Sequence, residues 1–240
     1  MHVHAYDEDS GRQRDDWETY ARIIEGIRAR EDVIVYPTIP LQGANRFAHL
    51  EELAQRGLIE WMVLDPGSVN FVRYDALEDA EHGLVYANSF VEIAQGMRIA
   101  RAHGLHPAYA VYEPGFTRLG VALAAGLSGA PSPIYRFMFS QEFAWGFPPR
   151  EAYLDAHVML LRELSPDAPW MIGGLGVDVR PLIPHAVRMG GHVRVGLEDA
   201  PWGSGLSNLE WVRSAADAIR KAGGEIATAA QVRATLRAGV

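Results

Sequence analysis

Short runs of β-branched and aromatic residues alternate along this chain with longer segments whose apolar residues recur at helical spacing. The runs that predict strands cover residues 1–5, 32–36, 61–64, 108–112, 134–139, 170–173 and 192–195. Strands that alternate with helices are typical of a parallel sheet with helices packed on it. We therefore expect an α/β fold.

The segments between these runs carry the start and stop signals of helices. Asp15 or Asp16 can cap a helix through Arg28, because a side-chain oxygen at this position accepts a hydrogen bond from a free backbone N–H. Ser89 can cap another helix, which ends at Gly104 because glycine readily adopts a left-handed conformation. Further helices are predicted at 149–164, 180–189 and 208–221, with a short last one after the capping-box pair Thr228 and Gln231.

Seven strand–helix units follow from this pattern, whereas a closed (β/α)8 barrel needs eight. The chain starts directly inside its first predicted strand. The prediction is therefore a TIM (β/α)8-type barrel whose first strand is missing from this chain, with residues 1–240 forming a single domain. An open doubly wound sheet is the alternative, because it tolerates seven strands. Only a barrel would bring polar residues from distant strand ends to one mouth.

The composition limits the classes of partner and cofactor. A formal net charge of −8, without runs of Lys and Arg, disfavours binding to nucleic acid. Because the chain has no cysteine, any bound metal must use His, Asp or Glu. The first ten residues are polar and acidic, unlike a secretory signal, and no apolar stretch is long enough to cross a membrane. These features predict a cytoplasmic protein.

Two histidines and a carboxylate form a candidate metal site. His2 and His4 are two residues apart in a predicted strand, so both side chains project to the same face. Glu198 follows the last predicted strand, at the end where barrel active sites lie. Such a trio leaves coordination positions open and suits Zn²⁺, although Fe²⁺, Mn²⁺ or Co²⁺ is also compatible. The alternatives are an exposed histidine pair and a structural ion-pair cluster of Arg194, Glu198 and Asp199.

Two loops after predicted strands are candidate substrate sites. Ser68 and Asn70 follow a turn at Gly67 and could hold a carboxylate, or they could satisfy only the backbone of their own turn. Gly174 and Gly176 follow the penultimate strand, where barrels often bind phosphate on backbone amides. Close packing of helix on strand explains these glycines equally well.

Three segments together resemble one known family. They are residues 2–7 (HVHAYD), 64–71 (LDPGSVNF) and 190–199 (GGHVRVGLED). Their order and spacing are similar to those of the β-keto acid cleavage enzymes along nearly the whole chain. The last segment is the most specific of the three.

The resemblance implies a Zn²⁺-dependent barrel, usually a homotetramer, that condenses a β-keto acid with acetyl-CoA to give acetoacetate and a new CoA thioester. It implies His2, His4 and Glu198 as metal ligands, Asp199 as the base and Arg194 as the electrostatic partner of that base. The residues expected to bind substrate are Thr38, Ser68, Asn70, Gly174 and Gly176. Another metal-dependent barrel lyase or hydrolase, or an inactive metal-binding remnant, is the alternative function.

The chain departs from the family pattern in three places. The family's first strand is absent, which puts barrel closure in question. Ala110 stands where some members have a glutamate that contacts substrate, so we expect no preference for an amino-bearing β-keto acid. The segment around Thr38 contains Pro37 and Pro40, which fix the local backbone, so the choice of substrate cannot be transferred from other members.

Overall fold

Five parallel strands form the main sheet of the protein. The computed structural model describes residues 1–41, 43, 45–78, 83–127 and 129–238. The strand order is β11–β10–β9–β8–β5, so each strand lies beside the next parallel strand along the chain, with β6 (Val69–Phe71) and β7 (Leu84–Tyr86) inserted between β5 and β8. The bounds are β5 (Trp61–Val63), β8 (His106–Val111), β9 (Ile134–Phe139), β10 (Trp170–Gly174) and β11 (His192–Val193). The sequence prediction of a parallel α/β sheet is therefore confirmed.

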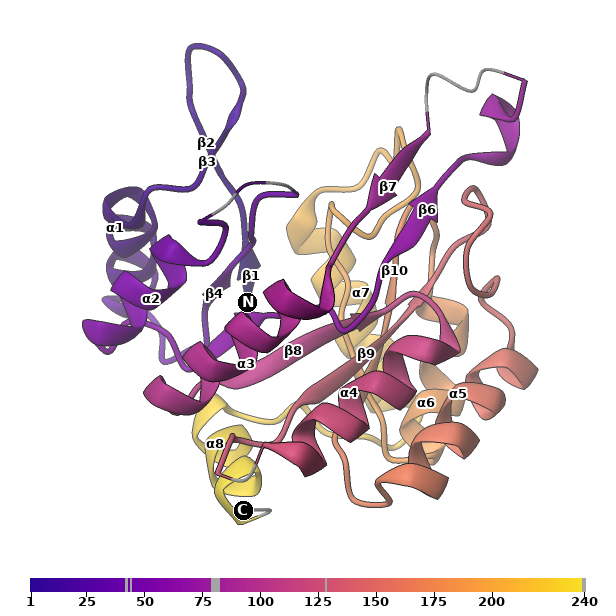
Figure 1. Cartoon of the computed structure of the whole chain (residues 1–240). Coiled ribbons are helices and arrows are strands. Elements are labelled where there is room, and N and C mark those ends of the chain that lie inside the picture. Colours follow the sequence, from indigo (N-terminus) through magenta and orange to yellow (C-terminus); the bar gives the residue numbers. More distant parts are fainter. Residues whose placement is uncertain (42, 44, 79–82, 128, 239–240) are drawn as a thin grey trace.

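Helices connect these strands and cover the outer face of the sheet (Figure 1). The connecting helices are α3 (Phe90–His103), α4 (Pro114–Gly126), α5 (Glu151–Leu164) and α6 (Ile183–Arg188), and two more helices, α7 (Asn208–Lys221) and α8 (Ala229–Ala238), follow β11. Short 3-10 turns stand at Tyr74–Ala76 and Arg180–Leu182. Among the described residues, no helix combines the length and apolar character needed to cross a bilayer.

A second parallel pair stands beside the main sheet. It consists of β1 (His2–Val3) and β4 (Tyr36–Pro37), with His2 opposite Tyr36, and it is flanked by α1 (Trp17–Arg28) and α2 (Ala48–Gln55). β4 packs next to β5 without forming a ladder. Within the described residues, no ladder joins β11 to β1 either, so the strands follow barrel order without a hydrogen-bonded closure.

Two antiparallel hairpins were not expected from the sequence. β2 (Ala5–Tyr6) pairs with β3 (Gln13–Arg14), and β6 (Val69–Phe71) pairs with β7 (Leu84–Tyr86). The predicted strand 1–5 is thus wrong in its extent. The strand is interrupted at His4, and the residues after it pair with β3 rather than with β4. The strand predicted at 32–36 is shorter and later, since only Tyr36 and Pro37 pair with β1.

The capping signals place several helix ends correctly. Asp16 accepts a hydrogen bond from the Thr19 backbone N–H and starts α1. Ser89 forms a capping box with Glu92 at α3, which ends at Gly104 with φ of 65°. α2 and α4 were not predicted, and neither has a side-chain hydrogen bond at its N-cap. α4 instead begins with Pro114 in its first turn, a start signal that the sequence prediction did not use.

Side chains on alternate positions of the strands face the helices or the interior. On β9 all six residues are buried, with Tyr135, Phe137 and Phe139 in the main core cluster beneath the helices. Arg136 lies between them on the other face and lines an interior cavity. This second face positions the candidate site.

Candidate active site

His2, His4 and Glu198 come together from opposite ends of the sequence. His2 lies on β1, His4 follows that strand, and Glu198 lies in the loop after β11. The Nε2 atoms of both histidines are 3.7 Å from the Glu198 carboxylate, one at each oxygen. Each of the three residues offers one possible ligand atom, and these three atoms all lie within 4.8 Å of one another. The predicted trio is therefore assembled by the fold.

The geometry of this trio suits a metal ion. Metal–nitrogen and metal–oxygen bonds of about 2 Å hold ligand atoms roughly 3–3.5 Å apart in tetrahedral sites, close to the 3.7 Å between each histidine Nε2 and Glu198. At 3.7 Å the histidines are too distant from Glu198 for good hydrogen bonds. Both ring nitrogens of His4 are buried without a hydrogen-bond partner among the described residues. An ion would supply the missing partner.

The electrostatics of His2 and Glu198 favour the protonation states that bind a metal. Burial is the main cause that lowers the pKa of His2, so its imidazole is neutral. The Nδ1 atom of His2 lies 3.3 Å from the Tyr36 carbonyl oxygen, which directs Nε2 toward Glu198. Burial alone would raise the pKa of Glu198, but His4 and the charge of Arg194 outweigh it and lower that pKa.

Arg194 links Glu198 to Asp199. Its Nε and Nη2 donate to Asp199 Oδ1 at 3.0 and 2.7 Å, and Nη2 is 3.1 Å from Glu198 Oε2. Burial raises the pKa of Asp199, while Arg194 opposes that rise. A buried carboxylate with a raised pKa has the properties of a general base. Asp199 is buried and does not belong to the wall of the cavity described next.

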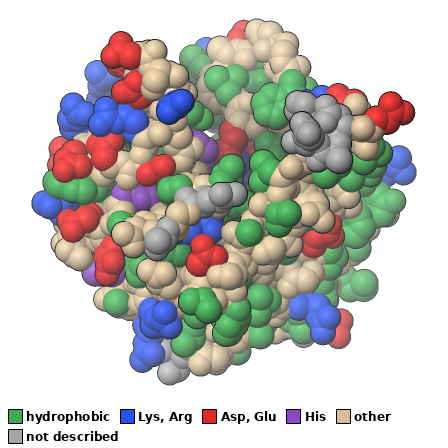
Figure 2. All heavy atoms as spheres, turned by 45° about the horizontal axis from the view of Figure 1, so that its top comes forward, with side chains coloured by type: hydrophobic (Ala, Val, Ile, Leu, Met, Phe, Trp, Pro, Cys, Tyr) green, Lys and Arg blue, Asp and Glu red, His purple; other side chains and the backbone are tan. Residues whose placement is uncertain are grey.

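A cavity of about 210 Å³ extends from the metal trio into the interior. Figure 2 shows this face hollowed, with histidine and acidic side chains beside the hollow. The cavity wall combines His2, His4, Glu198, Asp65 and Arg136 with apolar and aromatic side chains. The apolar part includes Val63, Phe71, Tyr86, Tyr112 and Leu175. Such a mixture can enclose a small acid and orient it.

Thr38 is one predicted substrate residue that the structure brings to this cavity. It follows β4 and is buried. Its backbone N–H donates to the Val3 carbonyl at 3.0 Å, and its own carbonyl lies 2.8 Å from His49 Nε2. The backbone of Thr38 is thus fixed from both sides, close to β1.

Ser68 and Asn70 do not reach the cavity wall. The Ser68 hydroxyl donates to the Asn88 carbonyl at 3.1 Å and accepts from the Asn88 N–H at 2.8 Å. Asn70 is exposed on β6. Ser68 therefore ties its loop to the backbone that follows β7.

The glycine segment at the end of β10 has most of its backbone amides in hydrogen bonds. The Gly174 N–H points to Asp199 Oδ1 at 3.4 Å, and the Leu175 N–H donates to the Phe139 carbonyl at 3.0 Å. Gly176 has φ of 66°, where a side chain would also come within 3.0 Å of Trp202. These contacts support close packing around the loop, and they join Gly174 to Asp199.

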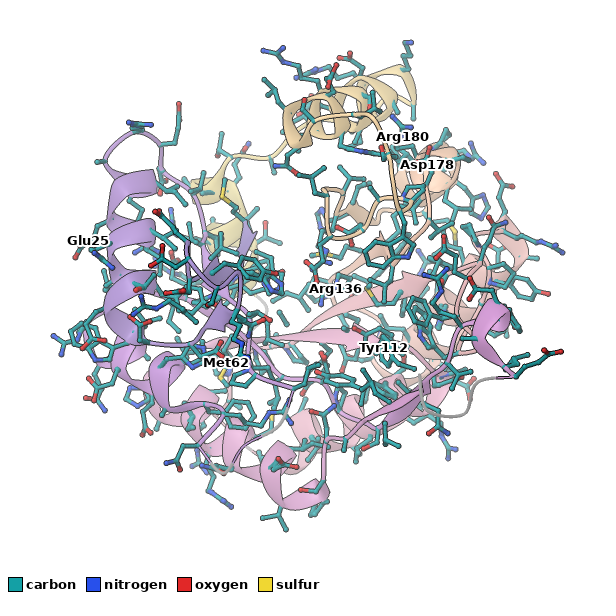
Figure 3. All side chains as sticks on the ribbon, turned by 90° about the horizontal axis from the view of Figure 1, so that it is seen from above. Glu25, Met62, Tyr112, Arg136, Asp178 and Arg180 are labelled. Carbon is teal, nitrogen blue, oxygen red and sulfur yellow. The ribbon has the colours of Figure 1, made fainter. Side chains whose placement is uncertain are left out.

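Two charged residues of the cavity were not singled out from the sequence. Asp65 is buried and accepts hydrogen bonds from the Ala110 N–H at 2.6 Å and the Tyr86 hydroxyl at 2.7 Å. Arg136 points toward the interior (Figure 3). The available signal was a single arginine inside an otherwise apolar strand, since an uncompensated charge seldom occupies such a position.

Comparison with known proteins identifies relatives of the whole chain. It is 28% identical to the 3-oxoadipate:acetyl-CoA acetyltransferase of Cupriavidus necator, over 98% of this chain and 79% of that protein. It is also 28% identical to the 3-keto-5-aminohexanoate cleavage enzyme of Fusobacterium nucleatum, over 98% of this chain and 82% of that protein.

Solved structures share the fold. The complex of ObcA with oxaloacetate superposes with a TM-score of 0.77 at 19% identity over 98% of this chain. This chain spans 62% of the length of that ObcA chain. The sequence profile of the beta-keto acid cleavage enzymes matches residues 1–237. With this match across nearly its full length, the chain belongs to the beta-keto acid cleavage enzyme family.

Proposed function

We propose that this protein condenses a β-keto acid with acetyl-CoA to give acetoacetate and the CoA thioester of the remaining acyl group. The reaction takes place beside a divalent metal ion, Zn²⁺ in the first instance, held by His2, His4 and Glu198. The observation that carries the proposal is the convergence of this trio and the Arg194–Asp199 pair in a member of this family. The relatives named for acetyl-CoA transfer and β-keto acid cleavage agree with it.

A bound divalent ion supplies a positive charge that polarises the keto oxygen of the substrate. The chain holds two of the three proposed ligands in the protonation state that binds a metal. His2 is neutral and oriented by the Tyr36 carbonyl, and Glu198 is ionised. Glu198 remains partly exposed, with 43% of its side chain open to solvent, so substrate can approach from that side.

In the proposed reaction Asp199, which lies outside the cavity wall and is joined through Arg194 to Glu198 on that wall, takes a proton from C2, the methylene between the keto and carboxylate carbons. C2 then bonds to the acetyl carbonyl carbon as the bond to the CoA sulfur breaks. The sulfur next bonds to the original keto carbon as the bond between that carbon and C2 breaks, and the proton returns to C2. Arg194 holds Asp199 in place through two hydrogen bonds to one oxygen. A positioned base of this kind contributes about 10²–10⁴-fold to the rate.

Metal analysis and a thioester-exchange assay test the proposal together. The purified protein is analysed for metal and then incubated with acetyl-CoA and a panel of β-keto acids. We expect about one metal per chain from the single trio found among the described residues, and acetoacetate together with a new CoA thioester from at least one acid.

The control omits acetyl-CoA. Product that forms without acetyl-CoA would assign the protein to another class of metal-dependent lyase or hydrolase. A metal-loaded protein that converts no member of the panel would contradict the proposed activity. A protein that cannot bind metal would contradict the proposed ligand set.

A further inference from the structure

Arg136 is a buried cation that the catalytic proposal does not use. It lies on β9, is 5% exposed, and contributes to the wall of the cavity below the metal trio. Its Nη1 donates to the Tyr36 hydroxyl at 3.3 Å, and its Nε points to Met138 Sδ at 3.3 Å. Neither partner carries a negative charge.

No carboxylate of the described residues lies within 4.0 Å of the Arg136 guanidinium, in contrast to other buried arginines. Arg194 is paired with Asp199 and Glu198, and Arg46 lies 3.6 Å from Glu92. A guanidinium keeps its proton at every physiological pH, so it cannot escape the cost of burial by becoming neutral. An anion that enters the cavity would remove this cost.

The acidic neighbour in the cavity is already engaged. Both oxygens of Asp65 accept strong hydrogen bonds, one from Tyr86 and one from the Ala110 backbone. The Nη2 group of Arg136 has no hydrogen-bond partner among the described residues. A planar guanidinium with a free N–H group is well suited to a carboxylate.

The strands beside Arg136 leave room for its long side chain. A Cβ added to Gly173 on β10 would lie 3.1 Å from the Cγ and Cδ atoms of Arg136, so glycine there lets the arginine stem lie across the strand. On the other side the register places Ala110 opposite Arg136, and its methyl group leaves the space beside the guanidinium open. Gly173 and Ala110 thus frame Arg136 with small residues.

Arg136 starts deeper than Glu198 and Asp199, because it lies inside β9 whereas they lie in the loop after β11. Arg136 is opposite Met171, and Met171 is opposite His192. Arg194 comes two residues after His192, just past the end of β11 at Val193, so its backbone is about 6–7 Å further along the strand direction than that of His192, at roughly 3.3 Å per residue. Glu198 and Asp199 follow Arg194 in the chain. A group bound by Arg136 is therefore displaced inward from the reacting carbons.

We propose that Arg136 binds a second carboxylate at the end of the substrate remote from the reacting carbons, so that the substrates are 3-oxo dicarboxylates. This inference rests on the proposed function. In a β-keto acid, the keto oxygen and the C1 carboxylate are separated by one methylene, so both remain with the reacting carbons. The chain on the other side of the ketone is the part that extends into the cavity and reaches Arg136.

A matched pair of acids tests this assignment. 3-Oxoadipate and 3-oxohexanoate have the same six-carbon chain and differ only in a carboxylate or a methyl group at the remote end. We expect wild-type kcat/KM to favour 3-oxoadipate by about 10- to 100-fold, the range for a buried hydrogen-bonded charge pair. Arg136→Met should abolish this preference and leave kcat/KM for 3-oxohexanoate nearly unchanged. Arg136→Lys should retain part of it, because the charge stays without the planar fork.

Calorimetric binding without acetyl-CoA gives a readout independent of turnover. The wild type should bind 3-oxoadipate more tightly than 3-oxohexanoate, and Arg136→Met should bind them equally. Arg98→Met, on the exposed surface of α3, is the matched control and should behave as the wild type. Circular dichroism and thermal unfolding show whether each variant is folded.

The outcomes separate this inference from the proposed function. Equal losses of kcat/KM for both acids in Arg136→Met would place Arg136 at the C1 carboxylate and overturn the inference. A wild type that binds both acids equally, or neither, would overturn it too. If the wild type prefers 3-oxoadipate in calorimetry but forms no acetoacetate from it, the proposed reaction fails while the carboxylate site stands.

Discussion

Arg194 and Asp199 form an ion pair in which two nitrogens of one side chain, Nε and Nη2, donate to a single carboxylate oxygen. The side chains are only 12% and 6% exposed. The same Nη2 contacts Glu198, so one guanidinium joins the proposed base to a proposed metal ligand. Both carboxylates neutralise the same Arg194 guanidinium, so a change at either one also alters the environment of the other.

Asp199→Asn should slow turnover by about 10²–10⁴-fold while metal stays bound, because the base is lost and the ligands are kept. The amide leaves Arg194 without its nearest counter-charge, so we also expect the free energy of unfolding to fall by about 3 kcal/mol, the lower end of the range for a buried pair because Glu198 still contacts Arg194. Metal analysis, steady-state kinetics and urea unfolding measure the three effects. An unchanged rate would remove Asp199 from the mechanism.

Glu198→Gln should lower both metal content and rate, since an amide oxygen is a weaker ligand than a carboxylate. Glu163 lies exposed on α5, and Glu163→Gln serves as the control for the same chemical change. The control should keep the wild-type metal content and rate. Full metal occupancy in Glu198→Gln would exclude Glu198 as a necessary ligand.

Removal of the metal should lower the melting temperature of the wild type. A ligand at 100 times its dissociation constant stabilises the folded state by about 2.7 kcal/mol, and a chelator withdraws that contribution. His4→Ala, which removes one of the three proposed ligands, should respond little to the chelator. Thermal unfolding with and without chelator measures both. Equal shifts in the two proteins would place the stabilising metal elsewhere.

The sequence predicts the elements whose signals are local. Ser89 and Gly104 mark the ends of α3, and β9 coincides with its apolar run, because caps and continuous hydrophobic runs depend only on neighbouring residues. The β6–β7 hairpin was not predicted. Its first strand follows the turn around Gly67, and its pairing partner lies beyond another loop, so no local pattern records the pairing.

The candidate site divides in the same way. His2, His4 and Glu198 could be predicted because their residue types and positions at strand ends already restrict their chemistry. Arg136 could not be assigned, since its proposed role depends on which face of β9 lines the cavity and on the lack of a carboxylate within 4.0 Å of its guanidinium among the described residues. Both are facts of tertiary structure.

Because the imidazole of His157 is buried, we expect the free energy of unfolding to fall in weak acid. His157 is 1% exposed on α5, stacks on the Phe137 ring at 4.6 Å, and has no hydrogen-bond partner for either nitrogen among the described residues. Burial lowers its pKa from 6.5 to about 4. The unfolded chain therefore binds more protons between these two pH values, and the free energy of unfolding falls as the pH falls.

From pH 7.5 to pH 5 this group alone should remove about 2 kcal/mol from the stability of the wild type. His157→Leu has no titrating ring, so its stability should fall less over the same interval, whatever its stability at neutral pH. Urea unfolding of both proteins across this range measures the two slopes. If the two plots of unfolding free energy against pH were parallel, His157 would be protonated in the folded state as readily as in the unfolded chain. That result would contradict its burial among the rings of Phe137, Phe139 and Phe147.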